Sequence, residues 1–349
     1  MAKRSISGNR APPPPAPAAA VPLEFTPFAT LSPDRVLEVI ERLGYRTDGR
    51  LLALNSYENR VYRVGIEDEP AVIAKFYRAG RWSDPAIEEE HVFAAALSEA
   101  EIPVVAPLVN AGHTLHHDDD CRFALYPNRP GRAPELDDPE VLRWLGRFIG
   151  RIHALGSTTR FCARPALTID RFGRESSAFI LASEYLPAEL HPVYQSVVSE
   201  LLDQVQSAFD QSGETHQLRL HGDCHPGNIL WAPSGPHFVD LDDCMSGPAV
   251  QDLWMLVAGD REEMSQQFGY LIEGYEDFHE FDTVELNLIE ALRTLRIMHY
   301  AAWLARRWHD PAFPLHFPWF NTQRYWQDHI LALREQQAAL QEMPLRLPR

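Results

Sequence analysis

Two carboxylates and one amide near the middle of the chain are spaced as phosphoryl transfer to a hydroxyl group requires. His221, Asp223 and Asn228 form the pattern H-x-D-x-x-x-x-N, and Asp240 follows twelve residues after Asn228 at the end of an expected strand. In this arrangement Asp223 orients the acceptor hydroxyl and takes its proton, so we expect it to be the catalytic base. Asn228 and Asp240 offer oxygen ligands of the kind that Mg²⁺ prefers, so we expect them to bind the metal that accompanies ATP.

Lysine is rare in this chain, which makes one lysine informative. Of the 32 basic side chains, only Lys3 and Lys75 are lysines. Lys75 lies in 71–77, an apolar pattern typical of a strand, where a compact ammonium suits a narrow site beside phosphates better than a planar guanidinium does. We therefore predict that Lys75 contacts the α- and β-phosphates of ATP. The alternative is one lysine that escaped a general arginine bias by chance.

A carboxylate from the next helix should hold Lys75 in place. Three successive acids, residues 88–90, are available. Glu90 shares a helix face with the apolar residues Phe93 and Leu97, so we predict that Glu90 points inward and pairs with Lys75. We expect Glu88 and Glu89 to be solvated.

The turn 55–59 lies where a phosphate-binding loop belongs, but it contains no glycine. Its Ser56 hydroxyl and its backbone N–H groups can donate to phosphate oxygens, although an Asn/Ser turn is more often only a turn. Asp242 and Asp243 follow Asp240 closely, and three acids this near one another repel unless a cation or backbone donors offset them. We expect Asp242 to support the metal site and Asp243 to be structural.

Composition limits the class of protein. The 349 residues are enough for a bilobal fold, and the net charge of −17 disfavours a nucleic-acid partner. No apolar run approaches the ~20 residues of a membrane span. Residues 1–24 are rich in Ala and Pro and lack the apolar core of a signal peptide, so we expect a disordered tail. The four cysteines form no C-x-x-C pair, which fits free thiols in the cytoplasm.

The expected elements form a small β-rich lobe followed by a larger helical lobe. Turn chemistry and periodicity predict a helix from Ser32 to Leu43 and another that opens at Ser83. A proline- and glycine-rich segment, 127–134, should be the hinge, which predicts a nucleotide-binding lobe at 25–127 and a helical catalytic lobe at 128–349. Strands are expected at 51–54, 60–64, 71–77, 105–109, 121–126, 218–220, 229–231 and 237–239, and helices at 139–155, 192–209, 250–257, 261–278, 283–307 and 325–341.

Taken together, these residues resemble the aminoglycoside-phosphotransferase and choline-kinase branch of the protein kinase fold. Within that branch the chain most closely resembles the bacterial stress response kinase A family, from about Phe25 to about Leu345. The strings that carry the resemblance are 54–62, 75–78, 81–82, 220–231, 238–243, 247–256 and 310–314.

The resemblance implies an α+β, bilobal protein-kinase-like fold and an ATP- and Mg²⁺-dependent serine/threonine protein kinase of the bacterial stress response. It implies a cytoplasmic monomer that acts on a protein hydroxyl, with no nucleic-acid or membrane partner. By this similarity Asp223 is the proton acceptor, Asn228 and Asp240 bind Mg²⁺, Asp240 is also catalytic, and Ser56 contacts ATP. Asp252 is then a buried acid that supports the catalytic loop. About nine residues separate Asp242 from Asp252, so no long activation segment is expected.

Three other functions stay open at this point. A small-molecule kinase that acts on an aminoglycoside, choline or homoserine would use the same residues, because a fold does not determine its acceptor. A metal-dependent hydrolase would use His221, Asp223 and His225 as ligands, but no further histidine completes a familiar set. A catalytically silent ATP-binding regulator would not need every acid that the chemistry requires.

Overall fold

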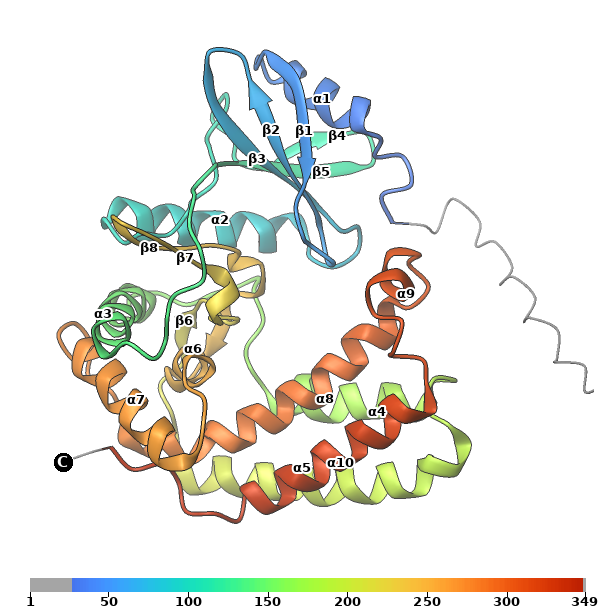
Figure 1. The fold of residues 1–349 in the computed structure, drawn as a ribbon, viewed down its shortest axis with the longest axis vertical. Helices are drawn as coiled ribbons and strands as arrows, with labels where there is room; N and C mark the ends of the chain where they lie inside the picture. The colour runs from blue at the N-terminus through green and yellow to red at the C-terminus, as the bar shows by residue number, and fades with distance from the viewer. Residues whose placement is uncertain (1–26, 348–349) are drawn as a thin grey trace, which may run out of the picture.

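The computed structural model describes residues 27–347 and has two lobes with a cavity between them (Figure 1). The small lobe is a five-stranded sheet with two helices, and the large lobe is mainly helical, so the predicted bilobal α+β fold is confirmed. The tail predicted at residues 1–24 lies outside the described residues. The sheet ends at Pro127, but the predicted domain boundaries themselves stay predictions.

The small lobe is built on one antiparallel sheet with the strand order β1-β2-β3-β5-β4. Helix α1 buries Val36, Val39 and Ile40 in the same apolar cluster as Val64 and Phe76 of the sheet. Helix α2 instead contributes to the apolar core of the large lobe, and Figure 1 shows it between the sheet and the rest of the molecule. The elements are α1 Pro33–Arg42, β1 Thr47–Ala53, β2 Arg60–Ile66, β3 Glu69–Tyr77, α2 Asp84–Glu99, β4 His116–Asp118 and β5 Cys121–Pro127.

Local sequence chemistry determines where these helices begin and end. The side chain of Ser32 caps α1 by accepting a hydrogen bond from the backbone N–H of Arg35, and Ser83 caps α2 in the same way. A proline occupies the first turn of both helices, and Gly44, with a φ of 94°, follows the end of α1. Both predicted helix starts are confirmed.

The strand predicted at 105–109 is wrong. Residues 105–109 form no strand, and the residue before them, Val104, makes a single parallel bridge with Phe238 of the large lobe. Pro103 and Pro107 have no N–H to donate, so the chain cannot extend this pairing into a ladder. The apolar side chains that suggested a strand instead connect the two lobes, and Val104 is part of the core of the large lobe.

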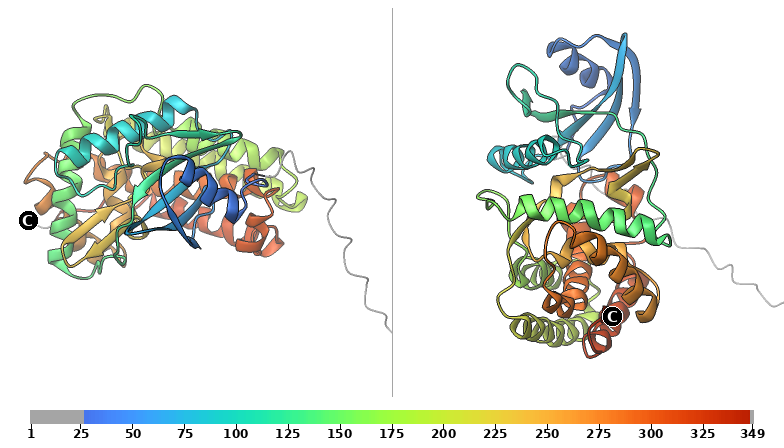
Figure 2. Two further views of the ribbon diagram at one scale, coloured as in Figure 1. Left: turned by 90° about the horizontal axis from the view of Figure 1, so that it is seen from above. Right: turned by 90° about the vertical axis from the view of Figure 1, so that its left-hand side faces the viewer.

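The large lobe consists of two packed groups of helices, one around α3 and α7 and one around α5, α8 and α10. Figure 2 shows α2 and α3 between the small-lobe sheet and the remaining helices. A π-helical turn, Asp170–Arg174, leads into α4 and was not predicted. The helices are α3 Pro139–Gly156, α4 Glu175–Ala182, α5 His191–Ser212, α6 Val250–Leu253, α7 Arg261–Tyr275, α8 Ile289–Arg307, α9 Ala312–His316 and α10 Gln323–Ala339.

Two small antiparallel pairs of strands carry the residues expected to do chemistry. Strand β6 (Leu218–Leu220) pairs with β9 (Met245–Gly247), and β7 (Ile229–Ala232) forms a hairpin with β8 (Gly235–Phe238). Strand β9 follows β8 after a few residues and lies between Asp242 and Asp252. The segment that joins these two acids is therefore short and ordered, as expected for a chain without a long activation segment. In residues 27–347, no helix has the length and apolar character needed to cross a bilayer.

Helices α3 and α7 approach so closely that glycine is required at their contact. A Cβ atom at Gly146 would lie 2.0 Å from the carbonyl oxygen of Leu271, and one at Gly274 would lie 2.0 Å from that of Arg143. Both glycines are buried in the large lobe, where the backbone of the facing helix cannot yield cheaply.

We predict that Gly146→Ala lowers the free energy of unfolding by about 1–3 kcal/mol, because the added methyl group overpacks the contact between α3 and α7. Urea denaturation followed by circular dichroism measures this change. Glu140→Ala, at an exposed position in the first turn of α3, is the control and should change stability by less than about 0.5 kcal/mol. Equal effects of the two substitutions would contradict the prediction.

Candidate active site

The loop that contains Asp223 lies in the large lobe between β6 and β7. Strand β6 ends at Leu220, and the turn Pro226–Asn228 leads into β7. Gly222 has a φ of 86°, a conformation that glycine adopts without strain. A Cβ atom at Gly222 would lie 2.1 Å from the carbonyl oxygen of Asp243. The loop therefore passes directly against the segment that carries the second group of acids.

Asp252 holds this loop by hydrogen bonds to its backbone. Its two carboxylate oxygens accept hydrogen bonds from the backbone N–H groups of His221 at 2.7 Å and of Gly222 at 2.8 Å. His153 lies 3.1 Å from the same carboxylate, and its other ring nitrogen lies 2.9 Å from the hydroxyl of Tyr275. Asp252 is almost fully buried. A buried carboxylate with these partners fixes the backbone of the loop, which is the placement that the family resemblance implied for Asp252.

Asp223 faces the cavity between two cationic or ionisable groups. Arg296 of α8 reaches one of its carboxylate oxygens at 2.5 Å, and His225 lies 3.5 Å from the other. Burial raises the pKa of Asp223, but the hydrogen bond from His225 and the charge of Arg296 outweigh it and hold the pKa well below its usual range. Asp223 is therefore ionised at neutral pH, the state in which a carboxylate can accept a proton.

Asn228 and Asp240 are brought together by the β7–β8 hairpin. The backbone N–H of Val239 donates to the carbonyl of Asn228 at 3.0 Å, which places Asp240 next in the chain beside it. The Asn228 amide N–H donates to the carbonyl of Asp223, so its amide oxygen is free to bind a cation. The Asp240 side chain is half exposed to the cavity. This pair of hard oxygen donors, with room for water and phosphate oxygens, fits Mg²⁺.

The histidines of the H-x-D-x-H segment do not form a metal cluster with Asp223. One ring nitrogen of His221 lies 2.9 Å from the carbonyl of Val239, and one of His225 accepts from the backbone N–H of Gly227. Within residues 27–347, no three His, Cys, Asp or Glu side chains converge as metal ligands would. The donor geometry therefore gives the hydrolase interpretation no support.

Lys75 extends from β3 into the group of acids at the lobe junction. Its ammonium lies 2.8 Å from Asp240, 3.2 Å from Asp242 and 3.9 Å from Glu90. Burial lowers the pKa of Lys75, but Asp240 and the other two carboxylates outweigh this and keep the pKa well above its usual value. The structure therefore brings together Lys75, Glu90 and Asp240, three of the residues predicted from the sequence.

Glu90 is held from the large lobe as well. Arg164 donates to the backbone carbonyls of Cys244 and Asp242, and its guanidinium lies 4.0 Å from Glu90. Burial raises the pKa of Glu90 to about 7, while Lys75 and Arg164 act in the opposite direction. The position of α2, which sets the position of Glu90, is thus coupled to the segment after Asp240.

The expectation that Glu89 is solvated is wrong. Its carboxylate accepts hydrogen bonds from three successive backbone N–H groups of the large lobe, those of Cys162 at 2.6 Å, Ala163 at 2.8 Å and Arg164 at 2.7 Å. Glu88 is exposed, as expected. The error has a simple cause, because no sequence pattern indicates that the loop 157–169 passes beside α2.

The turn between β1 and β2 lies over the acids of the large lobe, and Ser56 lines the cavity. The neighbouring Asn59 donates to the carboxylate of Asp242 at 3.2 Å and accepts from the backbone N–H of Arg78 at 3.1 Å. Asn59 is almost fully buried. The turn therefore has a defined position without glycine, because side chains rather than a flexible backbone hold it.

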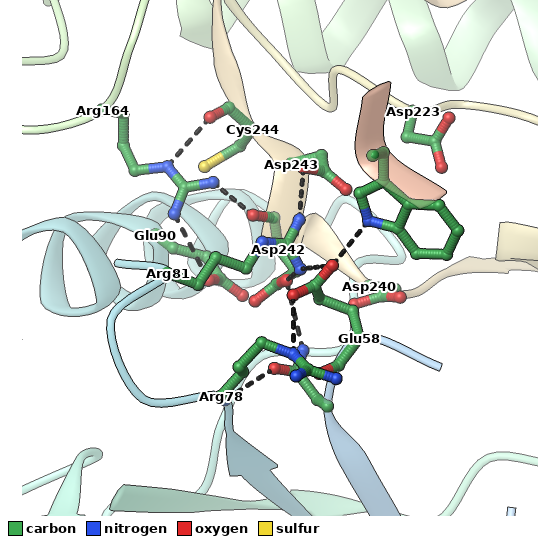
Figure 3. Close-up of polar contacts among 12 residues, drawn as sticks. Glu58, Arg78, Arg81, Glu90, Arg164, Asp223, Asp240, Asp242, Asp243 and Cys244 are labelled. Carbon is green, nitrogen blue, oxygen red and sulfur yellow. Dashed lines mark hydrogen bonds and ion pairs between the residues drawn. The ribbon is translucent and has the colours of Figure 1, made fainter. Parts of the chain in front are cut away.

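Glu58 connects this turn to helix α8 of the large lobe (Figure 3). Its carboxylate accepts a hydrogen bond from the indole N–H of Trp303 at 2.6 Å and pairs with Arg307 at 2.6 Å. On the small-lobe side it pairs with Arg78 at 3.1 Å, which also reaches the buried Asp310 at 2.7 Å. The turn 55–59 is thus attached to the large lobe by side-chain contacts of Glu58.

Arg81 neutralises the two acids that follow Asp240. Its guanidinium bonds to Asp242 and lies 2.6 Å from Asp243 (Figure 3). Burial raises the pKa of Asp242, but Arg81 and Lys75 outweigh it and hold the pKa well below its usual range. Repulsion among the three acids, which the sequence predicted, is therefore offset by cations of the small lobe.

Sequence reasoning did not assign a role to several residues of this site. Glu58 and Arg81 lie within strings that carry the family resemblance, and Asp252 was identified by that resemblance alone. The others are far away in the chain from the motif, and neither spacing nor periodicity marks them. They are His153, Arg164 and Arg296.

All of the predicted site residues line one cavity of about 1090 Å³ between the lobes. At one end, small-lobe residues face the β7–β8 hairpin and the segment 127–131. At the other end, α8 and the residues around Arg171 face Asp223. The apolar residues of the first end are Leu54, Val61, Ile73, Val105, Leu230 and Val239.

Comparison with known proteins gives consistent matches. Residues 50–289 match the model of the "Phosphotransferase enzyme family". The chain is 43% identical over 320 residues to stress response kinase A of Escherichia coli (strain K12), which covers 92% of this chain and 97% of that protein. It is 42% identical, with the same coverage, to a Salmonella typhimurium protein named serine/threonine protein kinase RdoA.

A solved structure shows the same fold. The amicoumacin kinase hAmiN, in complex with AMP-PNP, Ca²⁺ and Ami, superimposes with a TM-score of 0.69 over 89% of this chain and 94% of that chain. The two sequences are 20% identical, so this likeness shows the fold alone.

Asp252→Asn should weaken the support of the catalytic loop. Asparagine has the size of aspartate, but its NH₂ group cannot accept a hydrogen bond. One of the two backbone N–H groups that now donate to Asp252 therefore loses its acceptor. We expect the free energy of unfolding to fall by about 1–3 kcal/mol and the rate of ATP turnover to fall with it. Urea denaturation and initial-rate assays measure the two effects. Asp282→Asn, at an exposed helix cap where Asn serves as well as Asp, is the control; no difference between the variants would argue against this role of Asp252.

Arg296→Gln should change the pH dependence of activity. Removal of the positive charge takes away one of the influences that lower the pKa of Asp223, so this pKa rises even though the hydrogen bond from His225 remains. Because Asp223 must be ionised to act as a base, the acidic limb of the kcat/KM profile should move to higher pH. The matched control is Arg293→Gln, one turn earlier in α8, where the arginine pairs with Glu290. An acidic limb that stays in place would show that Arg296 does not set this pKa.

Proposed function

Because this chain belongs to the phosphotransferase enzyme family and is an ATP-dependent kinase, we propose that it is a Mg²⁺-dependent serine/threonine protein kinase. We further propose that it acts in the cytoplasm in a bacterial stress response. The observation that carries the proposed chemistry is the convergence of Asp223, Asn228, Asp240 and Lys75 on one cavity between the lobes.

The apolar end of the cavity suits the base of the nucleotide. Val61 and Ile73 of the small-lobe sheet and Leu230 and Val239 of the hairpin provide flat apolar walls. The backbone of 127–131 lies beside this slot and offers the polar groups that an adenine edge needs. ATP bound in this way has its phosphates directed toward the charged residues of the lobe junction.

The phosphate end of the nucleotide meets side chains of both lobes. Lys75 can donate to the α- and β-phosphates, with Glu90 as the carboxylate that orients its ammonium. Ser56 and the backbone of its turn can donate to phosphate oxygens from above. Asn228 and Asp240 would hold Mg²⁺, which, when bound, neutralises the charge that develops on the β- and γ-phosphate oxygens.

Asp223 is then the base that receives the proton of the acceptor hydroxyl. It is ionised, it faces the cavity, and Asp252 fixes the loop on which it lies. The reaction forms a bond between the acceptor oxygen and the γ-phosphorus, breaks the bond between that phosphorus and the bridging oxygen of ADP, and transfers the hydroxyl proton to Asp223.

The names of the similar proteins support a protein acceptor. One relative with 42% identity is named a serine/threonine protein kinase. The second candidate is a small-molecule kinase, which the fold shared with an amicoumacin kinase favours. The same phosphate chemistry serves both, so the acceptor is the point to test.

Purified enzyme with Mg²⁺ and γ-labelled ATP should transfer label to serine or threonine of protein acceptors in a cell extract. Asp223→Ala should reduce that transfer by about 10²- to 10⁴-fold, because the acceptor proton loses its base. Its affinity for Mg·ATP should be retained, since Asp223 is not among the expected phosphate or metal ligands. Phosphoamino-acid analysis and calorimetric titration measure the two quantities.

Asp203→Ala, an exposed aspartate of α5 far from the cavity lining, controls for the loss of one carboxylate. The same assay includes hydroxylated small molecules, among them aminoglycosides, choline and homoserine. Label that enters one of these compounds and no protein would reject the protein-kinase proposal in favour of the second candidate. Unchanged transfer by Asp223→Ala would remove Asp223 from the mechanism.

A further inference from the structure

One face of helix α8 forms the wall of the cavity beyond Asp223. Arg296, His299, Tyr300, Trp303 and Arg306 all line the cavity. Apart from the adjacent pair His299 and Tyr300, they recur at intervals of three or four residues, and since a helix has about 3.6 residues per turn they lie on one side of it. Arg296 contacts Asp223 near one end of this face, and Trp303 contacts Glu58 further along. This face of α8 is therefore available to contact an acceptor that reaches Asp223.

The cavity differs in charge from the rest of the protein. The whole chain has 32 Lys and Arg against 49 Asp and Glu, but the cavity lining has eight Lys and Arg against six Asp and Glu. On the side of α8, the acids already have cations. Asp223 pairs with Arg296, Glu58 with Arg307, and Asp243 with Arg81. The cavity therefore contains arginines that are not paired with any of its acids.

Two half-buried arginines line this end of the cavity, Arg171 of the π-helical turn and Arg306 of α8, and neither has a carboxylate within 4 Å among residues 27–347. The guanidinium of Arg306 lies over the ring of Phe179 at 4.8 Å, and that of Arg171 lies over the ring of Trp82 at 5.7 Å. Burial lowers the pKa of both arginines, although the exposed Glu175 partly offsets this. Arg306 also donates to the backbone carbonyl of Glu175 at 3.5 Å, and neither arginine is hydrogen-bonded to a carboxylate among the described residues.

We propose that Arg171 and Arg306 bind an anionic group of the acceptor, so that the enzyme prefers polypeptide segments with a carboxylate or phosphate near the reactive serine or threonine. The proposal rests on the protein-kinase function proposed above. Arginine is suited to this recognition because its planar fork matches both carboxylate and phosphate oxygens.

The geometry also predicts how many residues separate the anionic side chain from the reactive hydroxyl. Arg306 follows Arg296 by ten residues, which is roughly 15 Å along the helix axis. An extended peptide advances about 3.3 Å per residue. The anionic side chain should therefore lie about three to five residues from the hydroxyl that reaches Asp223.

The wild-type enzyme tests the preference without any substitution. Each peptide has one acceptor serine in an otherwise neutral sequence. One test residue, Glu, phosphoserine, Gln or Arg, is placed in turn at each position up to five residues before or after that serine. We expect kcat/KM for Glu or phosphoserine at three to five residues to exceed that for Gln by about tenfold, which is typical of a charge-assisted hydrogen bond. Arg at the same position should lower kcat/KM relative to Gln. The Glu and phosphoserine arms distinguish a carboxylate from a phosphate as the preferred anion.

Variants then assign the preference to the two arginines. Arg171→Gln and Arg306→Gln should each reduce the ratio of kcat/KM between acidic and neutral peptides toward one, and Arg306→Glu should favour the Arg peptide. Arg174→Gln is the matched control, because Arg174 is exposed, pairs with Asp170 and does not line the cavity. This control should keep the wild-type ratio.

The outcomes separate this inference from the function on which it rests. Peptides phosphorylated regardless of charge, or best with Arg, would overturn the anion site and leave the protein-kinase function standing. The same holds for an acidic preference that survives both Gln variants. Transfer to small hydroxylated molecules, with none to any peptide or protein, would overturn the protein-kinase function and this inference together.

Discussion

The structure depends on the compensation of negative charge at the junction of the lobes. Four acids, Glu90, Asp240, Asp242 and Asp243, come close together there, and three of them are partly or fully removed from water. Like charges at such distances in a site of low polarity are strongly unfavourable unless cations lie among them. Lys75 and Arg81 of the small lobe, and Arg164 of the large lobe, are those cations.

This compensation has a consequence for the arrangement of the lobes. The acids belong mostly to the segment after β8, whereas Lys75 and Arg81 belong to the other lobe. The negative charge at the junction is therefore offset only when the two lobes are correctly placed relative to each other. Glu58 and Asp310 add to the same effect at the outer side of the cavity, because each is an acid of one lobe that pairs with arginine of the other. A nucleotide that brings further negative charge enters a site in which the cations are already oriented.

The catalytic loop is held by a different kind of interaction. Asp252 and Gln251 act on the backbone of His221 and Gly222, and Gly222 permits the close approach to Asp243. Backbone fixation of this kind positions Asp223 without a phosphorylated activation segment, for which the short connection between Asp242 and Asp252 leaves no room. On the acceptor side of the cavity Arg171 and Arg306 have no carboxylate partner among the described residues, and that is where members of one fold can differ in what they phosphorylate.

The sequence by itself predicted most of the helices and strands and a set of candidate residues for the reaction. Local signals such as Ser32 and Ser83 at helix starts depend on contacts within one turn, so they could be read directly. The spacing of Asp223, Asn228 and Asp240 spans one hairpin, and the structure places the three residues together. The roles of these residues in catalysis and metal binding stay proposals.

Only the tertiary structure decided which distant residues complete the site. Glu58 meets Trp303 across 245 positions, and Arg296 meets Asp223 across 73, distances in the chain over which no periodicity carries information. The strand expected at 105–109 failed for a related reason, since its apolar residues serve contacts between the lobes and its prolines prevent a ladder. Long-range pairing of charges depends on how the two lobes pack, and that packing is a property of the whole folded chain.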